Sequence, residues 1–178
     1  MGMRNSREQA PPSEAVAILE TTAMSRSQFV WYEFFAGGGM ARLGFGPTWK
    51  CTFANDICEK KATAYRAFFG PSPELKVKDV GQLTINNLSG VPDLVWASFP
   101  CQDLSLAGNG AGLAGKRSGT FKPFWRLIDG LVREGRAPRL VVLENVTGTL
   151  TSHSGADFRS IARAFVESGY RLDRKSVV

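Results

Sequence analysis

Short apolar runs that alternate with helical segments constrain the fold of this chain more than any other feature. The β-prone runs are residues 29–35, 49–54, 75–80 (a short strand and a turn), 93–98 and 140–143. Segments 40–43, 59–69, 121–133 and 157–168 are expected to be helical from their apolar spacing. This alternation predicts an α/β fold with a mostly parallel sheet, right-handed crossovers and helices on both faces.

The chain is expected to hold one domain behind a flexible leader. Residues 1–27 are polar and weakly patterned, whereas residues 28–178 carry all of the alternating elements. The full length of 178 residues is enough to bury a core. Residues 170–172 are a candidate sixth strand, and the chain ends just where a doubly wound sheet would continue. We therefore expect a fold that is cut short at its C-terminal end.

The net charge and the spacing of the cysteines limit the classes of function that fit this chain. The net charge of +6 is compatible with a polyanionic partner but does not require one. Cys51, Cys58 and Cys101 form no close Cys-x-x-Cys pair, which favours reduced, intracellular thiols over disulfides or a metal site. His153 is the only histidine, so a Cys-His dyad would require it to lie beside Cys101. We expect neither a membrane span nor a signal peptide.

A glycine-rich turn follows the first strand at residues 35–39, with the sequence FAGGG. Glycines at this place let the backbone approach a ligand, although a tight turn without a ligand has the same composition. The dinucleotide pattern G-x-G-x-x-G is matched only at Gly37 and Gly39, because Arg42 stands at its third glycine position. The turn therefore favours a nucleoside cofactor other than NAD.

Two aspartates follow the next strands. Asp56 comes 19 residues after Gly37, where α/β nucleotide sites place a carboxylate on the ribose diol. Asp79 follows the third strand and could accept a hydrogen bond from an adenine amino group. The alternatives are a solvated or helix-capping Asp56 and an ordinary turn aspartate at Asp79.

Cys101 directly follows Pro100 and the fourth strand, at the sheet edge where α/β enzymes keep their chemistry. Proline restricts the backbone on both sides, so the thiol is held stiffly. Lys116 and Arg117 could supply the positive charge that favours a thiolate. We interpret Cys101 as a nucleophile, the alternative being a buried structural thiol, which is our interpretation of the other two cysteines.

Glu144 follows the fifth strand, which we expect to lie beside the fourth. A carboxyl group at the end of an apolar strand is expected to be partly desolvated, which favours its protonated form. Glu144 is therefore a candidate proton donor next to Cys101. The alternative is a strand-end acid that points into water.

Taken together, these motifs resemble those of the DNA (cytosine-5) methyltransferases in their order and spacing across residues 29–172. The matching segments are FAGGG at 35–39, Asp56, Asp79, SFPCQ at 98–102, RSGT at 117–120 and ENV at 144–146. The resemblance implies a Rossmann-like fold, S-adenosylmethionine as methyl donor, double-stranded DNA as partner and a flipped cytosine as target.

The resemblance also implies residue roles. Cys101 would add to C6 of the cytosine, and Glu144 would hold and protonate N3. Asp56 would bind the ribose hydroxyls, Ile57 would pack on the adenine and Asp79 would meet its amino group. The whole donor pocket would comprise Phe35, Ala36, Gly37, Gly39, Asp56, Ile57, Asp79 and Pro100. A glycine-rich loop from 103 to 118, with DNA contacts from Gln102, Ser105 and Arg117, would close over the DNA.

Departures from the family pattern define the alternatives. Met40 replaces a common glycine, and the family's later motifs, target-recognition domain and last helix do not follow. We therefore expect the catalytic half of a restriction-modification methyltransferase, cytoplasmic and nucleoid-associated in a bacterium or phage, with a second chain as a candidate source of the missing motifs. One alternative is a non-catalytic or split fragment that binds S-adenosylmethionine or DNA and needs a partner chain. Another is an NAD-type enzyme in which Cys101 is structural.

Overall fold

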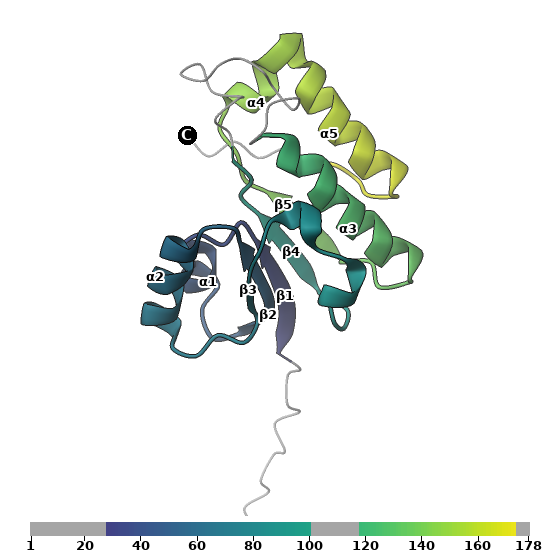
Figure 1. The fold of residues 1–178 in the computed structure, drawn as a ribbon. Helices are drawn as coiled ribbons and strands as arrows, with labels where there is room; N and C mark the ends of the chain where they lie inside the picture. The colour runs from purple at the N-terminus through teal and green to yellow at the C-terminus, as the bar shows by residue number, and fades with distance from the viewer. Residues whose placement is uncertain (1–27, 101–117, 174–178) are drawn as a thin grey trace, which may run out of the picture.

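Among the described residues, five strands form a parallel sheet in the order β3-β2-β1-β4-β5, with helices on either side (Figure 1). The computed structural model describes residues 28–100 and 118–173. The strands are β1 (Phe29–Phe34), β2 (Trp49–Asp56), β3 (Leu75–Val77), β4 (Leu94–Ala97) and β5 (Leu140–Leu143). The predicted parallel sheet is confirmed.

The predicted sixth strand is wrong. Residues 170–173 form no strand. Instead, the Tyr170 ring packs against Trp125 and Phe165, and its hydroxyl donates a hydrogen bond to the carbonyl of Pro138. The side chain therefore turns this segment back onto the helices, so the backbone does not extend the sheet beyond β5.

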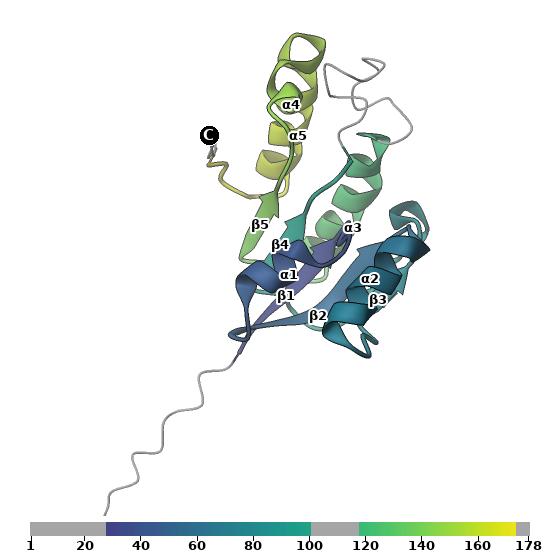
Figure 2. The same cartoon turned by 90° about the vertical axis from the view of Figure 1, so that its left-hand side faces the viewer.

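The helices lie on both faces of the sheet, as predicted. They are α1 (Met40–Phe45), α2 (Glu59–Phe69), α3 (Phe121–Arg133), α4 (Gly148–Thr151) and α5 (Ala156–Glu167). Short 3₁₀ turns are η1 (Val80–Gln82), η2 (Ile85–Asn87), η4 (Ser118–Thr120) and η5 (Ser152–Gly155). Figures 1 and 2 show α1 and α2 on one side of the sheet and α3 on the other. Among the described residues, no helix is long and apolar enough to cross a membrane.

The larger core lies between the sheet and α3. The apolar side chains of α3 recur three or four residues apart, which places them on one buried stripe of the helix. Phe124 of this stripe meets Phe34 of β1 edge-on, with 5.0 Å between ring centroids. Trp125 meets Phe165 of α5 at 4.4 Å, so α5 packs beside α3 (Figure 1). These contacts pack α3 against β1 and α5 against α3.

A smaller core lies under α1 and α2. Because side chains alternate along a strand, Trp31 and Glu33 of β1 face this layer while Tyr32 and Phe34 face α3. Phe45 of α1 lies 4.5 Å from Trp31, ring centroid to centroid. Beside this contact, β2 carries an extra residue between its pairs with Trp31 and Tyr32, which is a β-bulge.

Candidate functional site

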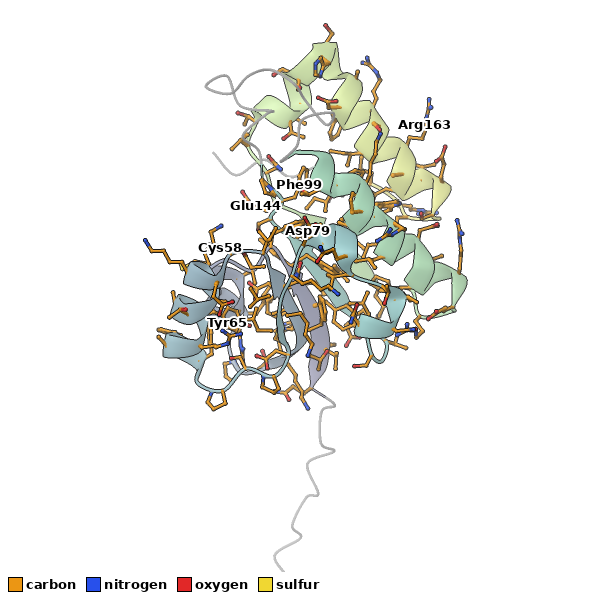
Figure 3. All side chains as sticks on the ribbon, viewed as in Figure 1. Cys58, Tyr65, Asp79, Phe99, Glu144 and Arg163 are labelled. Atoms are coloured by element: carbon orange, nitrogen blue, oxygen red, sulfur yellow. The ribbon has the colours of Figure 1, made fainter. Side chains whose placement is uncertain are left out.

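The carboxyl ends of the strands meet at one edge of the sheet, where the strand order reverses between β1 and β4. In open α/β sheets, the turns after the strands on either side of such a reversal diverge and leave a crevice. Figure 3 shows Asp79, Phe99 and Glu144 at this edge. All of the described residues that the sequence predicts as site residues lie at this edge, because each follows a strand.

The glycine-rich turn after β1 has an unusual backbone. Phe35 has φ 58°, and Gly37 and Gly39 have φ 57° and 86°. A left-handed phenylalanine is strained, and such strain persists where the surrounding structure enforces it. Here the Ala36 N–H donates to the carbonyl of Asn55 at 2.8 Å, which ties the turn to β2. A Cβ at Gly39 would lie 2.3 Å from the ring of Phe69, so this position needs glycine.

Asp56 joins the glycine-rich turn to the start of α2. Its side chain is buried, with 4% exposure, and accepts two backbone hydrogen bonds. The Gly37 N–H donates to Oδ2 at 2.9 Å and the Cys58 N–H donates to Oδ1 at 2.8 Å. The N-cap residue of α2 is Cys58, so Asp56 is not the helix cap that the sequence left as an alternative. Each oxygen retains a second lone pair for a ligand hydroxyl.

Asp79 is exposed, and one of its oxygens has a structural role. Oδ1 accepts a hydrogen bond from the Gly81 N–H at 2.7 Å, which caps η1. The turn-aspartate alternative is therefore present in the structure. Because a carboxylate has two oxygens, this cap leaves room for a ligand contact as well.

A pocket of about 320 Å³ opens between these elements. Five predicted site residues line it: Phe35, Asp56, Ile57, Asp79 and Pro100. Ala36, Gly37 and Gly39 do not line it, and Gly37 reaches it only through its bond to Asp56.

Six further residues line the pocket: Asn55, Lys61, Lys78, Val80, Ser98 and Thr120. Ser98 and Thr120 lie within the motifs at 98–102 and 117–120 but were given no role, and the other four were not predicted as site residues. The two lysines add positive charge at the mouth of the pocket, and neither forms an ion pair with another described residue. Lys61 lies in the first turn of α2, four residues after Ile57, and Lys78 directly precedes Asp79. The closeness of the two lysines in sequence to the predicted site residues Ile57 and Asp79 is the signal that could have identified them.

The ends of β4 and β5 are hydrogen-bonded side by side. The Glu144 N–H donates to the carbonyl of Ala97 at 3.0 Å, and the side-chain amide of Asn145 donates to the carbonyl of Phe99 at 3.0 Å. The structure thus brings Glu144 next to the segment that leads into the predicted nucleophile. Cys101, Gln102, Ser105 and Arg117 lie outside the described residues.

The side chain of Glu144 is exposed, which corrects the expectation of a partly desolvated acid. The reason lies in the topology: β5 is an edge strand of the sheet. Its side chains are covered less than those of the central strands, as the exposure of Leu140 illustrates.

A buried carboxyl group behind the glycine-rich turn was missed entirely. Glu33 of β1 is 1% exposed, and its Oε2 has no hydrogen-bond partner among the described residues. Burial raises the pKa of Glu33 to about 7, although the nearby Arg42 of α1 opposes this rise. Burial likewise raises the pKa of Cys51 to about 12, which supports a structural role for that thiol.

Arg42 of α1 contacts α2 and the residue just before β3. Its guanidinium donates to the Tyr65 hydroxyl at 2.9 Å, pairs with Glu74 and lies 4.3 Å from the centroid of the Phe69 ring. The residue that breaks the dinucleotide pattern therefore anchors α1 to α2. Within the described part of the chain, no group of three or more His, Cys, Asp or Glu residues is arranged to hold a metal ion.

Comparison with known proteins gives a consistent match. The family model of C-5 cytosine-specific DNA methylases matches residues 29–177. Type II methyltransferase M.BsuFI of Bacillus subtilis is 32% identical over 148 residues, which are 82% of this chain and 34% of that protein. Type II methyltransferase M2.BsuMI of Bacillus subtilis strain 168 is 33% identical over 145 residues, 80% of this chain and 36% of that protein. The chain therefore spans about a third of the length of these relatives.

Among solved structures, the Dnmt2 methyltransferase of S. pombe superposes with a TM-score of 0.57 at 22% identity. The match covers 77% of this chain and 42% of that one. This likeness shows the fold, and it confirms the predicted Rossmann-like methyltransferase architecture.

Proposed function

Because the chain belongs to the family of C-5 cytosine-specific DNA methylases, we propose that residues 28–178 form the catalytic, donor-binding domain of such an enzyme. Its reaction is the transfer of a methyl group from S-adenosylmethionine to C5 of a cytosine flipped out of double-stranded DNA. The biological setting is a type II restriction-modification system, by analogy with the two relatives. We further propose that residues 1–27 are a leader outside this domain.

The observation that carries this proposal is the pocket at the reversal of strand order. It holds Asp56 and Asp79 on one side and Ser98 and Pro100 on the other. The buried carboxylate of Asp56 can accept from two adjacent ribose hydroxyls, one at each oxygen. The pocket volume of about 320 Å³ falls in the range of small-molecule sites. The residues present therefore fit a nucleoside methyl donor.

The donor would supply a methyl group on a positively charged sulfur, which a carbon nucleophile can attack. The protein's task is to make C5 of cytosine such a nucleophile. The thiolate of Cys101 adds to C6, and Glu144 donates a proton to N3, so that the electron pair of the C5–C6 bond becomes available at C5. The hydrogen bond between the Glu144 N–H and Ala97 supports this pairing, since it places the ends of β4 and β5 together. Loss of the C5 proton later expels Cys101.

A second candidate is a donor-binding or DNA-binding chain that becomes active only with a partner chain. The exposure of Glu144 favours it, because a general acid works best when it is shielded from water. The partner would then cover β5 and supply the base-reading contacts.

Methyl transfer from tritium-labelled S-adenosylmethionine to cytosine-containing duplex DNA tests both candidates. We expect label in DNA with the wild-type chain, none with Cys101→Ser, and a loss of about 10²- to 10⁴-fold with Glu144→Gln. Glu167→Gln, at the exposed end of α5, is the matched control and should behave as wild type.

The same duplex with 5-fluorocytosine tests the covalent step directly. In this duplex C5 carries fluorine in place of hydrogen, so no proton can be removed from C5. The enzyme should therefore remain attached to DNA through Cys101 after methyl transfer. Label transfer that survives Cys101→Ser would refute the mechanism. No transfer by the wild-type chain, together with transfer once a C-terminal half of a relative is added, would favour the second candidate.

A further inference from the structure

A chain of hydrogen bonds links α4 to the wall of the donor pocket. The hydroxyl of Thr149 donates to Asn145 Oδ1 at 3.0 Å, and the Val146 N–H donates to the same oxygen at 2.9 Å. The Nδ2 group of Asn145 then donates to the carbonyl of Phe99 at 3.0 Å. All three donors agree with one orientation of the carboxamide, with its oxygen toward α4 and its nitrogen toward β4.

The Asn145 side chain adds a hydrogen bond between the ends of β4 and β5, beyond the last backbone bond of the sheet. The last backbone bond between them runs from the Glu144 N–H to Ala97. Two residues further along, the carbonyl of Phe99 takes its hydrogen bond from a side chain instead of the backbone. Phe99 precedes Pro100, which has no N–H and is restricted in φ, so this carbonyl fixes the direction of the chain as it enters the pocket wall.

The place of Thr149 favours a specific function for its hydroxyl. Thr149 is 7% exposed, and a buried hydroxyl without a partner is costly. It lies in the first turn of α4, and its hydroxyl reaches back to Asn145 in the segment between β5 and α4. Thr151, on the same helix, points its hydroxyl to the carbonyl of Gly148 and does not reach Asn145.

We propose that Thr149 is a positioning residue: its hydroxyl fixes the Asn145 carboxamide, which holds the Phe99 carbonyl and thereby sets the pocket wall formed by Ser98 and Pro100. The expected effect on methyl transfer rests on the proposed function, whereas the positioning role itself does not. Without the Thr149 hydroxyl, the Val146 N–H is the remaining donor to Oδ1, so the carboxamide and the strand end that it bonds are held less firmly.

The test compares three variants of the full chain. Thr149→Val keeps the shape of the side chain and removes the hydroxyl, whereas Thr149→Ser keeps the hydroxyl and removes the methyl group. Thr151→Val removes a hydroxyl from the same helix and is the matched control. Two measurements need no enzymatic activity. They are the exchange rate of the Asn145 side-chain amide protons by NMR and the alkylation rate of Cys101 by mass spectrometry, with Cys58 as internal reference.

We expect Thr149→Val to raise both rates about threefold to tenfold, the ratio that corresponds to one ordinary hydrogen bond. Thr149→Ser and Thr151→Val should match the wild type, and the reference thiol should not change. In the methyl-transfer assay, Thr149→Val should lower kcat/KM for the donor by a similar factor, since Ser98 and Pro100 line the donor pocket.

Wild-type rates in Thr149→Val would overturn the proposal. Equal effects of Val and Ser, or a larger effect of Ser, would also overturn it, because they would show that the methyl group matters through packing. Failure of the proposed function would appear separately, as absence of label transfer by the wild-type chain, and would leave the two activity-independent measurements intact.

Discussion

Replacing Glu33 with glutamine should stabilise the protein at neutral and alkaline pH. Glu33 is 1% exposed under α1, and its pKa is raised to about 7, mainly by burial. A carboxyl group whose pKa is raised in the folded state stabilises the fold while it is protonated. That contribution is fully present below the unfolded pKa of about 4.5 and is lost as the pH rises through about 7.

The magnitude follows from the shift itself. A rise from 4.5 to about 7 corresponds to about 3 kcal/mol, since one pKa unit is worth about 1.4 kcal/mol. Glutamine keeps the shape of the protonated acid and carries no charge. The free energy of unfolding of Glu33→Gln minus that of the wild type should therefore grow by up to about 3 kcal/mol between pH 5 and pH 8.

Urea unfolding monitored by tryptophan fluorescence measures this difference, because the chain has four tryptophans and the buried Trp31 is on the same face of β1 as Glu33. Transitions at pH 5, 6.5 and 8 define the slope. Glu59→Gln is the matched control, since the Glu59 side chain is 69% exposed, and it should change stability by less than about 0.5 kcal/mol at each pH. A stability difference between Glu33→Gln and wild type that stays constant over this range would refute the reasoning.

Three further predictions concern the turn, the pocket and the thiols. Gly39→Ala should destabilise the fold by about 2 kcal/mol or more in urea unfolding, because its Cβ would lie 2.3 Å from a ring of α2 at a φ of 86°. Gly38→Ala, whose Cβ would meet nothing within 4 Å, should stay within about 0.5 kcal/mol of wild type. Asp56→Asn should weaken the binding of S-adenosylhomocysteine about tenfold or more in calorimetry, because the NH₂ group of the asparagine would face the backbone N–H of Gly37 or Cys58. Unchanged affinity would show that Asp56 is not part of the site. At pH 8 the native Cys51 thiol, whose pKa is raised to about 12, should alkylate at least about tenfold more slowly than Cys58, and equal rates would contradict its burial.

Local pattern was enough to predict the elements that carry the site. The periodic apolar stripe of residues 121–133 gave the bounds of α3, and the apolar run 140–143 gave those of β5. Because ligand-binding residues of α/β sheets follow strands, strand ends also located Asp56 and Asp79 at the pocket. These predictions needed only short-range spacing and a general rule of topology.

Contacts between distant segments could not be predicted in the same way. Asn145 bonds a carbonyl 46 residues earlier in the chain, and nothing in the sequence near it indicates that partner. Glu33 reads as an ordinary polar member of an alternating strand, and only the position of α1 shows that it is buried. The exposure of Glu144 depends on β5 being an edge strand, which the sequence left open.

The strand order has a consequence for how the pocket forms during folding. β1 first meets β2, about 20 residues later, and the turn, Asp56 and their mutual hydrogen bond lie within this local unit. β4 lies about 60 residues beyond β1, so its pairing closes a much longer loop and is expected to form later. A ligand that touches both Asp56 and Pro100 would bridge an early half and a late half of the molecule. Such a ligand should slow unfolding more than it speeds refolding.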